Sequence, residues 1–221
     1  MVARVDDTRT RLLEAAERLF AEKGIDAVSL REITRESGAR NAIAVQYHFD
    51  DRAGVLRAIF GKHLPEVDAR RHAMLDEYEA RREPDVRALA SALVRPLAAK
   101  LADPDGGLQF LQIYAEVVDR PREPVSTGAD SLQRWRALVE PLLDEEAARL
   151  HRRFTAVLHT AQELGRRART GPRADDRLFT SYLIDVVAAI LAAPVSPETR
   201  RLAAERDERR FCVDAPPKNQ G

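Results

Sequence analysis

Apolar residues recur at helical spacing along almost the whole chain. The first helix is predicted over residues 7–23, where positions i, i+4, i+7 and i+8 form one apolar face: Leu12, Ala16, Leu19 and Phe20. Gly24 is expected to end this helix as a C′ residue, and Ile25 is expected to pack back against it.

Two short helices are predicted next. Ser29 and Glu32 have the spacing of a capping box, in which each side chain satisfies the other's backbone amide, so the second helix begins here and ends by Gly38. The third helix is predicted over residues 41–48. A longer helix followed by two short helices that a tight glycine turn joins is typical of a helix-turn-helix domain.

From Asp51 onward the pattern predicts further helices. The first of these carries acidic residues at its positive end and ends or kinks at Pro65. We therefore expect an all-α chain. The remaining helices are predicted over residues 86–102, 107–119, 130–143, 144–169 and 175–193, with a short charged helix over 198–210 and a disordered tail over 213–221.

Composition agrees with this fold class and narrows the function. Ala, Leu, Arg and Glu favour helices and dominate the chain, whereas only 10 of its 221 residues are Gly. The 36 basic residues balance 36 acidic ones, so any DNA binding must come from the local placement of arginine. Cys212 is the single cysteine, which excludes a disulfide framework and a thiolate metal cluster, and we expect neither metal nor cofactor.

The protein is expected to be cytoplasmic and to have no membrane partner. Its first ten residues lack the apolar core of a signal peptide. The longest apolar run, over residues 186–193, is far shorter than the roughly 20 residues that cross a bilayer.

The third predicted helix and the turn before it suit the major groove of DNA. Groove-facing side chains must be small, polar or basic, because a bulky apolar row would neither fit nor hydrogen-bond. Arg can pair with guanine, and Asn or Gln can pair with adenine. Val45 is expected to anchor the helix on the core. The residues that meet the requirements of the groove are Arg40, Asn41, Ala42, Ala44 and Gln46.

Three adjacent rings, those of Tyr47, His48 and Phe49, end this helix. Successive helical residues point about 100° apart, so three rings cannot share one face. We expect Phe49 to return to the core and the other two rings to donate hydrogen bonds to phosphate oxygens, which sets the register of a protein on DNA. The alternatives are that Tyr47 is a core residue and that Arg40 and Asn41 are plain turn residues.

With these features, residues 7–60 resemble the DNA-binding domain of the TetR family of bacterial repressors. The shared pattern is the end of the first helix at residues 20–24, the capped start of the second at 28–33, then Gly38, the three rings, and Asp51 followed by Arg52. The resemblance implies that Ser29 lies near a phosphate, that Arg31 can touch DNA and that Arg52 pairs with a phosphate. For Arg52 the alternative is a solvated helix residue.

Two positions depart from the family pattern. The distance from Gly38 to Phe49 is one residue longer than usual, so base contacts among Arg40, Asn41 and Ala42 could shift by one position. Thr34 stands where a small Ala is usual, which affects how the second helix packs on the third.

The resemblance also implies a homodimer with two domains. Residues 1–50 would form the helix-turn-helix domain, residues 51–212 a helical regulatory and dimerisation domain, and residues 213–221 the disordered tail. Two recognition helices about one DNA turn apart would then read a palindromic operator. Apolar residues of the last two long helices would form the dimer interface: Phe154, Leu158, Leu178, Phe179, Tyr182, Val186 and Ile190.

A hydrophobic small molecule is expected to release the DNA by favouring a state of the dimer with the wrong helix separation. Its pocket would lie among the middle helices, where polar side chains on otherwise apolar helices are candidates. For each of them the alternative is a satisfied buried polar group or a surface residue. These candidates are His72, Gln109, Gln112, Tyr114, His159 and Gln162.

The expected function is thus that of a ligand-responsive repressor, and not of an enzyme. A helical enzyme with three similar helices is the alternative class, but it would need a catalytic constellation, and neither a phosphate-loop motif nor an HExxH motif occurs. A module that binds only proteins is a third alternative. A salt titration distinguishes the protein-binding module from the repressor, because DNA binding weakens steeply with added salt through counterion release.

Overall fold

The computed structural model describes residues 2–41, 43–81, 83–120 and 130–213, and side chains from residue 8 to residue 207 within these ranges. Within them all regular elements are helical, which confirms the all-α expectation. The predicted loop at 120–124, apart from its first residue, and the tail from 214 lie outside the described residues.

The N-terminal part consists of α1 (Val2–Lys23), α2 (Leu30–Glu36) and α3 (Ala44–Phe49). The body consists of α4 (Arg52–Arg81), α5 (Val86–Ala98), α6 (Gly107–Val118), α7 (Asp130–Val139), α8 (Glu145–Arg149), α9 (Arg152–Arg169), α10 (Arg177–Ala192) and α11 (Pro197–Val213). Short 3₁₀ turns follow α5 and α7 at Ala99–Ala102 and Glu140–Leu142.

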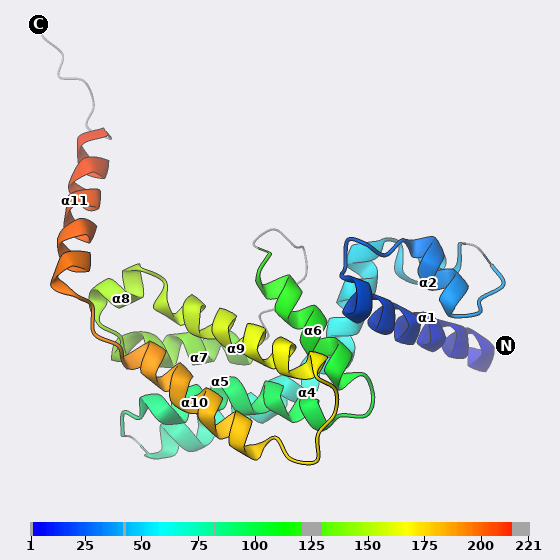
Figure 1. The fold of residues 1–221 in the computed structure, drawn as a ribbon, viewed down its shortest axis with the longest axis horizontal. Helices are drawn as coiled ribbons and strands as arrows, with labels where there is room; N and C mark the ends of the chain where they lie inside the picture. Colours follow the sequence, from blue (N-terminus) through cyan, green and yellow to red (C-terminus); the bar gives the residue numbers. More distant parts are fainter. Residues whose placement is uncertain (1, 42, 82, 121–129, 214–221) are drawn as a thin grey trace, which may run out of the picture.

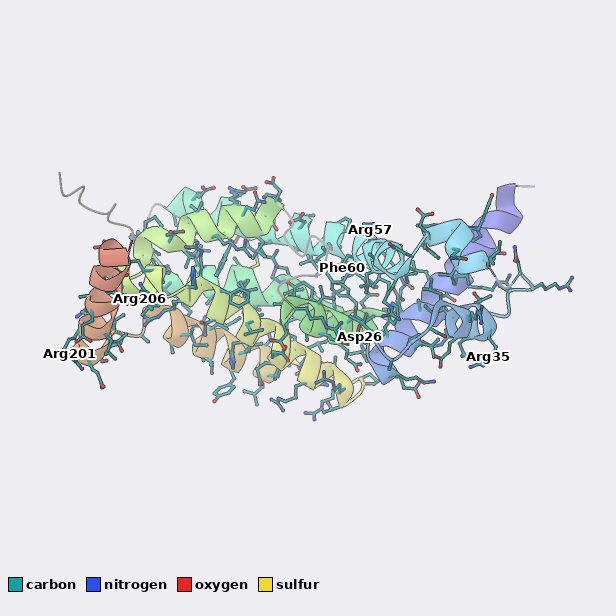
Figure 2. All side chains as sticks on the ribbon, turned by 90° about the horizontal axis from the view of Figure 1, so that it is seen from above. Asp26, Arg35, Arg57, Phe60, Arg201 and Arg206 are labelled. Carbon is teal, nitrogen blue, oxygen red and sulfur yellow. The ribbon has the colours of Figure 1, made fainter. Side chains whose placement is uncertain are left out.

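The N-terminal helices and α11 lie at opposite ends of an elongated molecule (Figure 1). Figure 2 places Arg35 of α2 at one end, and Arg201 and Arg206 of α11 at the other. Between the ends, α6 packs on α9, and α10 packs on both α5 and α9. Gly165 allows the first of these contacts, because a Cβ atom there would lie only 2.6 Å from the Cβ of Ala115 on α6.

Several helix boundaries differ from the predicted ones. The first helix starts at residue 2, five residues early, and the third starts at residue 44, three residues late. Pro65 does not end α4. Proline has no N–H for the carbonyl of Gly61, but both residues are exposed, so water can reach that carbonyl. The single helix predicted over 144–169 is broken at His151, which adopts a left-handed conformation with φ of 58°.

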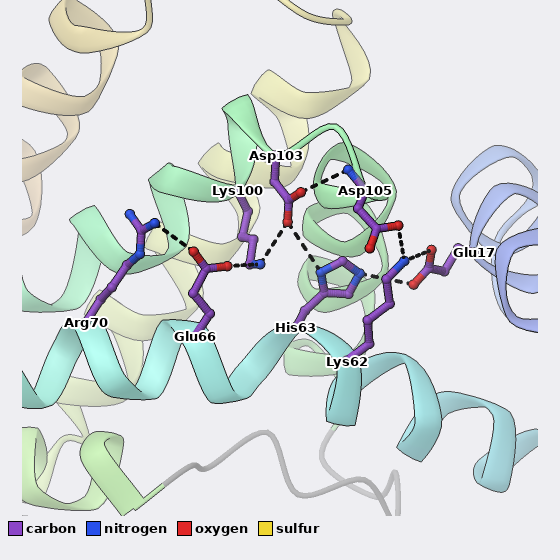
Figure 3. Close-up of polar contacts among 8 residues, drawn as sticks. All are labelled: Glu17, Lys62, His63, Glu66, Arg70, Lys100, Asp103 and Asp105. Atoms are coloured by element: carbon purple, nitrogen blue, oxygen red, sulfur yellow. Dashed lines mark hydrogen bonds and ion pairs between the residues drawn. The ribbon is translucent and has the colours of Figure 1, made fainter. Parts of the chain in front are cut away.

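Polar contacts join the N-terminal helices to the body. The backbone amide of Ile25, in the turn after α1, donates to both carboxylate oxygens of Glu116 on α6 at 3.2 Å. Glu17 of α1 is buried, and its carboxylate accepts from His63 Nε2 at 3.0 Å and from Lys62 Nζ at 3.1 Å, both on α4 (Figure 3). The N-terminal helices are therefore fastened to α4 and α6 by charged groups as well as by the shared core.

The same charged network continues into the turn before α6 (Figure 3). Lys62 Nζ also donates to Asp105 at 2.8 Å, and His63 Nδ1 lies 3.9 Å from Asp103. Lys100 Nζ donates to Asp103 at 2.8 Å and to Glu66 of α4 at 2.6 Å. Burial alone would lower the pKa of the Lys62 and Lys100 ammonium groups, but their hydrogen bonds to carboxylates raise it.

Candidate nucleic-acid interface

The start of α2 is capped as its sequence predicts. Ser29 Oγ accepts a hydrogen bond from the backbone amide of Glu32 at 3.2 Å. The Glu32 carboxylate accepts from Lys23 Nζ at 2.7 Å, and this bond is the main reason why the pKa of Glu32 is lowered. Ser29, the capping residue, and Arg31, in the first turn of α2, are both exposed.

The turn between α2 and α3 contains the first of the expected base-reading residues. Gly38 adopts φ of 70°, which lets the chain reverse after α2. Asn41 Oδ1 accepts from the Ile43 amide at 3.1 Å, and this side-chain turn delays the start of α3. Arg40 and Asn41 are exposed residues of the turn rather than of a helix, and Ala42 lies outside the described residues.

The short helix α3 presents two opposite faces. Val45 and Phe49 are buried, as predicted, and Gln46 is exposed. Tyr47 is 76% exposed, which rules out the core alternative, and the half-buried ring of His48 lies edge-on to it at 5.1 Å. The three rings therefore diverge as helical geometry requires.

Ala44 corrects one expectation. Its side chain is only 5% exposed, because α3 turns this position toward the core together with Val45. It is therefore not on the face that presents Gln46 and Tyr47, and we remove it from the candidate contacts. Ile43, at 59% exposure, is the apolar residue on the outer surface of this turn.

The junction between α3 and α4 is tight. Asp50 adopts φ of 64°, and Asp51 Oδ1 accepts from the Gly54 amide at 2.6 Å. A Cβ atom on Gly54 would lie 1.7 Å from the backbone oxygen of Phe49, so only glycine fits there. The position of α3 relative to α4 is thus set by the backbone.

Arg52 has an intramolecular role that its sequence position does not reveal. Its Nη2 donates to the Val28 carbonyl at 2.8 Å, and its Nη1 lies 3.6 Å from an Asp26 carboxylate oxygen. These contacts tie the start of α4 to the segment before α2. The side chain remains partly exposed, so a phosphate contact stays a prediction.

Arg9 of α1 was not singled out from the sequence. Its guanidinium carbon lies 5.1 Å from the centre of the Phe49 ring, over the end of α3. This places a further cation beside the recognition helix. An isolated arginine on an exposed helix position carries no local sequence signal that would have identified it.

The six candidate effector contacts do not line one pocket. Gln109 and Gln112 border an open depression of about 290 Å³ between α6 and α1, and Gln112 Nε2 donates back to the Leu108 carbonyl. Gln162 donates to the Ala115 carbonyl at 3.0 Å, across the contact of α9 with α6. These three glutamines therefore do not share one site, and two of them bond to backbone carbonyls.

The remaining candidates are also apart. Tyr114 is buried in a cluster with Phe60 and Phe110. His72 lies between α4 and α7, where Arg134 Nη1 approaches its Nδ1 at 3.3 Å, and His159 is half-buried on α9.

The expected dimer residues form an exposed apolar surface on α9 and α10. Leu178 is 84% exposed and Tyr182 is 67% exposed, and Phe154 is also exposed. The other four are half-buried: Leu158, Phe179, Val186 and Ile190. Single exposed apolar residues are normal, but apolar side chains that are grouped on two helices packed together favour an interaction surface.

The three N-terminal helices define a helix-turn-helix DNA-binding protein. The second helix is capped, a glycine turn follows it, and the short third helix has an outward polar face. Residues 12–59 match the family model described as "Bacterial regulatory proteins, tetR family". The chain thus carries the N-terminal domain of the TetR family and is a DNA-binding transcriptional regulator.

Among solved structures, the chain is similar to a TetR-family regulator from Streptomyces coelicolor A3, with 17% identity and a TM-score of 0.42. The similarity covers 84% of this chain and 95% of that one. No curated protein matches the sequence.

Within the described residues, no single helix is long and apolar enough to cross a membrane. In the same part of the chain, no group of three His, Cys, Asp or Glu side chains is arranged to hold a metal ion.

Proposed function

We propose that the protein is a homodimeric cytoplasmic repressor, without enzymatic activity, that leaves a palindromic operator when a small molecule binds. The observation that carries the proposal is the outward polar face of the helix-turn-helix, within the segment that matches the family model. We assign residues 1–50 to DNA binding and residues 51–212 to regulation and dimerisation. The boundary lies between α3, which ends at Phe49, and α4, which begins at Arg52.

Base reading is assigned to Gln46 first. Its side chain is exposed on α3, and a glutamine can make two hydrogen bonds to adenine. Arg40 and Asn41 are the further base-reading candidates, in the turn before it. Asn41 already uses Oδ1 to accept from the Ile43 amide, so pairing with adenine would draw on the second lone pair of that oxygen.

Phosphate binding is assigned to residues around this helix. Tyr47 and His48 lie at its end, and Ser29 and Arg31 lie at the start of α2, where the backbone amides of a helix N-terminus also favour anions. Arg52 is included because part of its guanidinium remains exposed. Contacts of this kind bind any DNA sequence.

Dimerisation is assigned to the exposed apolar surface of α9 and α10. Burying Leu178 and Tyr182 against a second copy removes apolar area from water, which favours association. A twofold pair of chains would also supply the two recognition helices that a palindrome requires.

The DNA assignment is tested by selecting a binding sequence from random DNA and titrating it at several salt concentrations. We expect Gln46→Ala to lose about 1–3 kcal/mol on the selected sequence and little on random DNA. Arg31→Ala should instead weaken both and lower the salt slope by about two for a dimer, one per protomer. Gln133→Ala, an exposed glutamine on α7, is the matched control. Affinity that does not change with salt would contradict DNA binding.

The dimer is tested by sedimentation of the purified chain. Leu178→Asp together with Tyr182→Asp should convert a dimer into a monomer, because each charge would be buried in the interface. Ile43→Asp, at an equally apolar exposed position on the other domain, should remain dimeric. A wild-type monomer at micromolar concentration would refute the homodimer.

A further inference from the structure

Arg71 of α4 is a buried cation without an acidic partner. Its side chain is 2% exposed, and no carboxylate oxygen among the described residues lies within 4.0 Å of it. Nε donates to the Ala92 carbonyl at 3.2 Å and Nη1 donates to Ser131 Oγ at 3.0 Å, and both acceptors are neutral. Burial lowers the pKa of the Arg71 guanidinium, and the negative charge of Asp68, which lies beyond ion-pair distance, offsets this only in part. Burying a guanidinium without a directly bonded carboxylate is costly, so its retention calls for an explanation.

One of the two contacts has a structural reason. Four residues after Ala92, α5 contains Pro96, which has no N–H to offer the Ala92 carbonyl. Arg71 Nε supplies the missing donor. The Nη end of the guanidinium is not needed for this purpose, and it is the end whose forked geometry matches a carboxylate.

The Nη end lies where four helices of the body meet. Ser131 is fully buried at the start of α7, and its amide donates to Asp68 of α4 at 3.1 Å. Burial raises the pKa of the Tyr114 phenol on α6, while the positive charges of Arg71 and Arg136 act in the opposite direction. Two cations thus act on this buried region, together with one carboxylate that already accepts a backbone hydrogen bond.

We infer that Arg71 binds the carboxylate of an organic monocarboxylic acid, the effector of this regulator. The inference rests on the proposed effector response and names its chemical class. A single negative charge suits the site, because the positive charges of Arg71 and Arg136 exceed the negative charge of Asp68 by one, whereas a dianion would leave an excess negative charge. Each of the same four helices also carries a fully buried apolar residue, and such residues suit an apolar remainder on the acid: Leu75, Leu89, Phe110 and Trp135.

Binding at this site changes the contact between two helices. The acid replaces Ser131 as the partner of Nη1, so the start of α7 separates from α4. A ligand that binds only the separated arrangement shifts the protein toward it. Because α4 continues to the DNA-binding helices, this arrangement can differ from the DNA-bound one in the position of α3.

The test uses the full-length protein without DNA and the fluorescence of Trp135, the single tryptophan, which lies one turn after Ser131 on α7. The probes are straight-chain carboxylates from butanoate to dodecanoate and their uncharged methyl esters. We expect at least one acid to change the fluorescence saturably and to raise Tm, and its ester to bind at least about tenfold more weakly, because a charge-assisted bond is lost.

Variants locate the site. Arg71→Lys keeps a charge and a donor for the Ala92 carbonyl but loses the fork, so it should fold and bind the acid at least about tenfold more weakly. Arg71→Met should lose binding, and Arg71→Lys decides alone if that variant does not fold. Arg70→Met is the control, since Arg70 is exposed on the adjacent position and pairs with Glu66.

Three results would overturn the inference: no acid in the series alters fluorescence or Tm, acid and ester bind equally, or Arg71→Lys binds as the wild type does. Its failure is distinguishable from that of the proposed function. Loss of the Arg71 site with intact salt-sensitive operator binding would leave the regulator standing. Acid binding without any operator binding would support the Arg71 site and contradict the proposed regulator function.

Discussion

Glu17 provides the most direct test of how the DNA-binding helices are held on the body. Its carboxylate is 3% exposed and accepts from both Lys62 and His63. Breaking a buried ion pair by removing one partner costs about 3–5 kcal/mol. After Glu17→Ala, Lys62 keeps its bond to Asp105 at 2.8 Å and His63 keeps Asp103 at 3.9 Å, so we expect the lower end, about 3 kcal/mol.

The assay is equilibrium urea unfolding followed by helix circular dichroism, at one fixed protomer concentration because a dimer's stability depends on it. The expected loss corresponds to a Tm lower by about 6–12 °C. Glu17→Gln keeps an oxygen that can accept from His63, so its stability should lie between that of the wild type and that of Glu17→Ala. Glu14→Ala, at an exposed position on the same helix, should change stability by less than about 0.5 kcal/mol. A loss below about 1 kcal/mol for Glu17→Ala would refute the reasoning.

Three further predictions concern packing and pH. Gly165→Ala should destabilise the protein by about 1–2 kcal/mol, since the new Cβ would overlap α6. Gly61→Ala, with open space around its Cβ, should stabilise the protein by about 0.5–1 kcal/mol. Thermal unfolding should therefore show a lower Tm for the first variant and a higher Tm for the second. Gly54→Ala should displace α3 and cost about 3 kcal/mol or more, measured by the same method together with operator affinity. Burial alone would raise the pKa of Asp103, but the hydrogen bond from Lys100 lowers it. The bond between Lys100 and Asp103 therefore stabilises the fold fully above the pKa of an unfolded aspartate, and this stabilisation is lost as the pH falls through the lower folded pKa. Urea unfolding at a series of pH values between about pH 5 and pH 2 would show the loss.

Local features of the DNA-binding helices could be predicted from the sequence. The cap of α2 depends on Ser29 and Glu32, three residues apart, and the structure contains the predicted bond. The outward Tyr47 and inward Phe49 follow from helical rotation alone. These predictions succeed because each depends on neighbours within one helical turn.

The sequence is least informative where a side chain has a choice of partners. Asn41 can continue a helix or bond to the amide of Ile43, and the sequence does not say which is preferred. Arg52 could face DNA or reach Val28, which is close only after folding. Ala44 is the first residue of α3 and is buried beside Val45, which the sequence does not show because a small alanine suits an inner or an outer position.

The body is less predictable for a related reason. Only residue type points to the candidate effector contacts, and in the structure Gln112 and Gln162 bond to backbone carbonyls. Residue type does not distinguish Arg71, because a buried arginine and the solvated arginines around it look alike in sequence. Only the positions of Ala92 and Ser131 in the folded protein distinguish it.

One helix connects the proposed ligand site to the DNA-binding helices. Arg52 and Arg71 are both on α4, 19 residues and thus about 28 Å apart along its axis. Glu17 fastens α1 to this helix between them, through Lys62 and His63. A movement of α4 at Arg71 therefore reaches α1 through those bonds.

This arrangement separates binding from response. Glu17→Ala should leave the affinity for a carboxylate within about twofold, because Arg71 is untouched, while it reduces the ability of that acid to release DNA. Arg71→Lys should show the reverse, with weak acid binding and normal operator affinity. Fluorescence titration and operator titration on the same samples measure the two effects. If Glu17→Ala releases DNA at the same acid concentration and to the same extent as the wild type, the Glu17 contacts do not carry the coupling, and the shared apolar core of α1, α4 and α6 would have to do so.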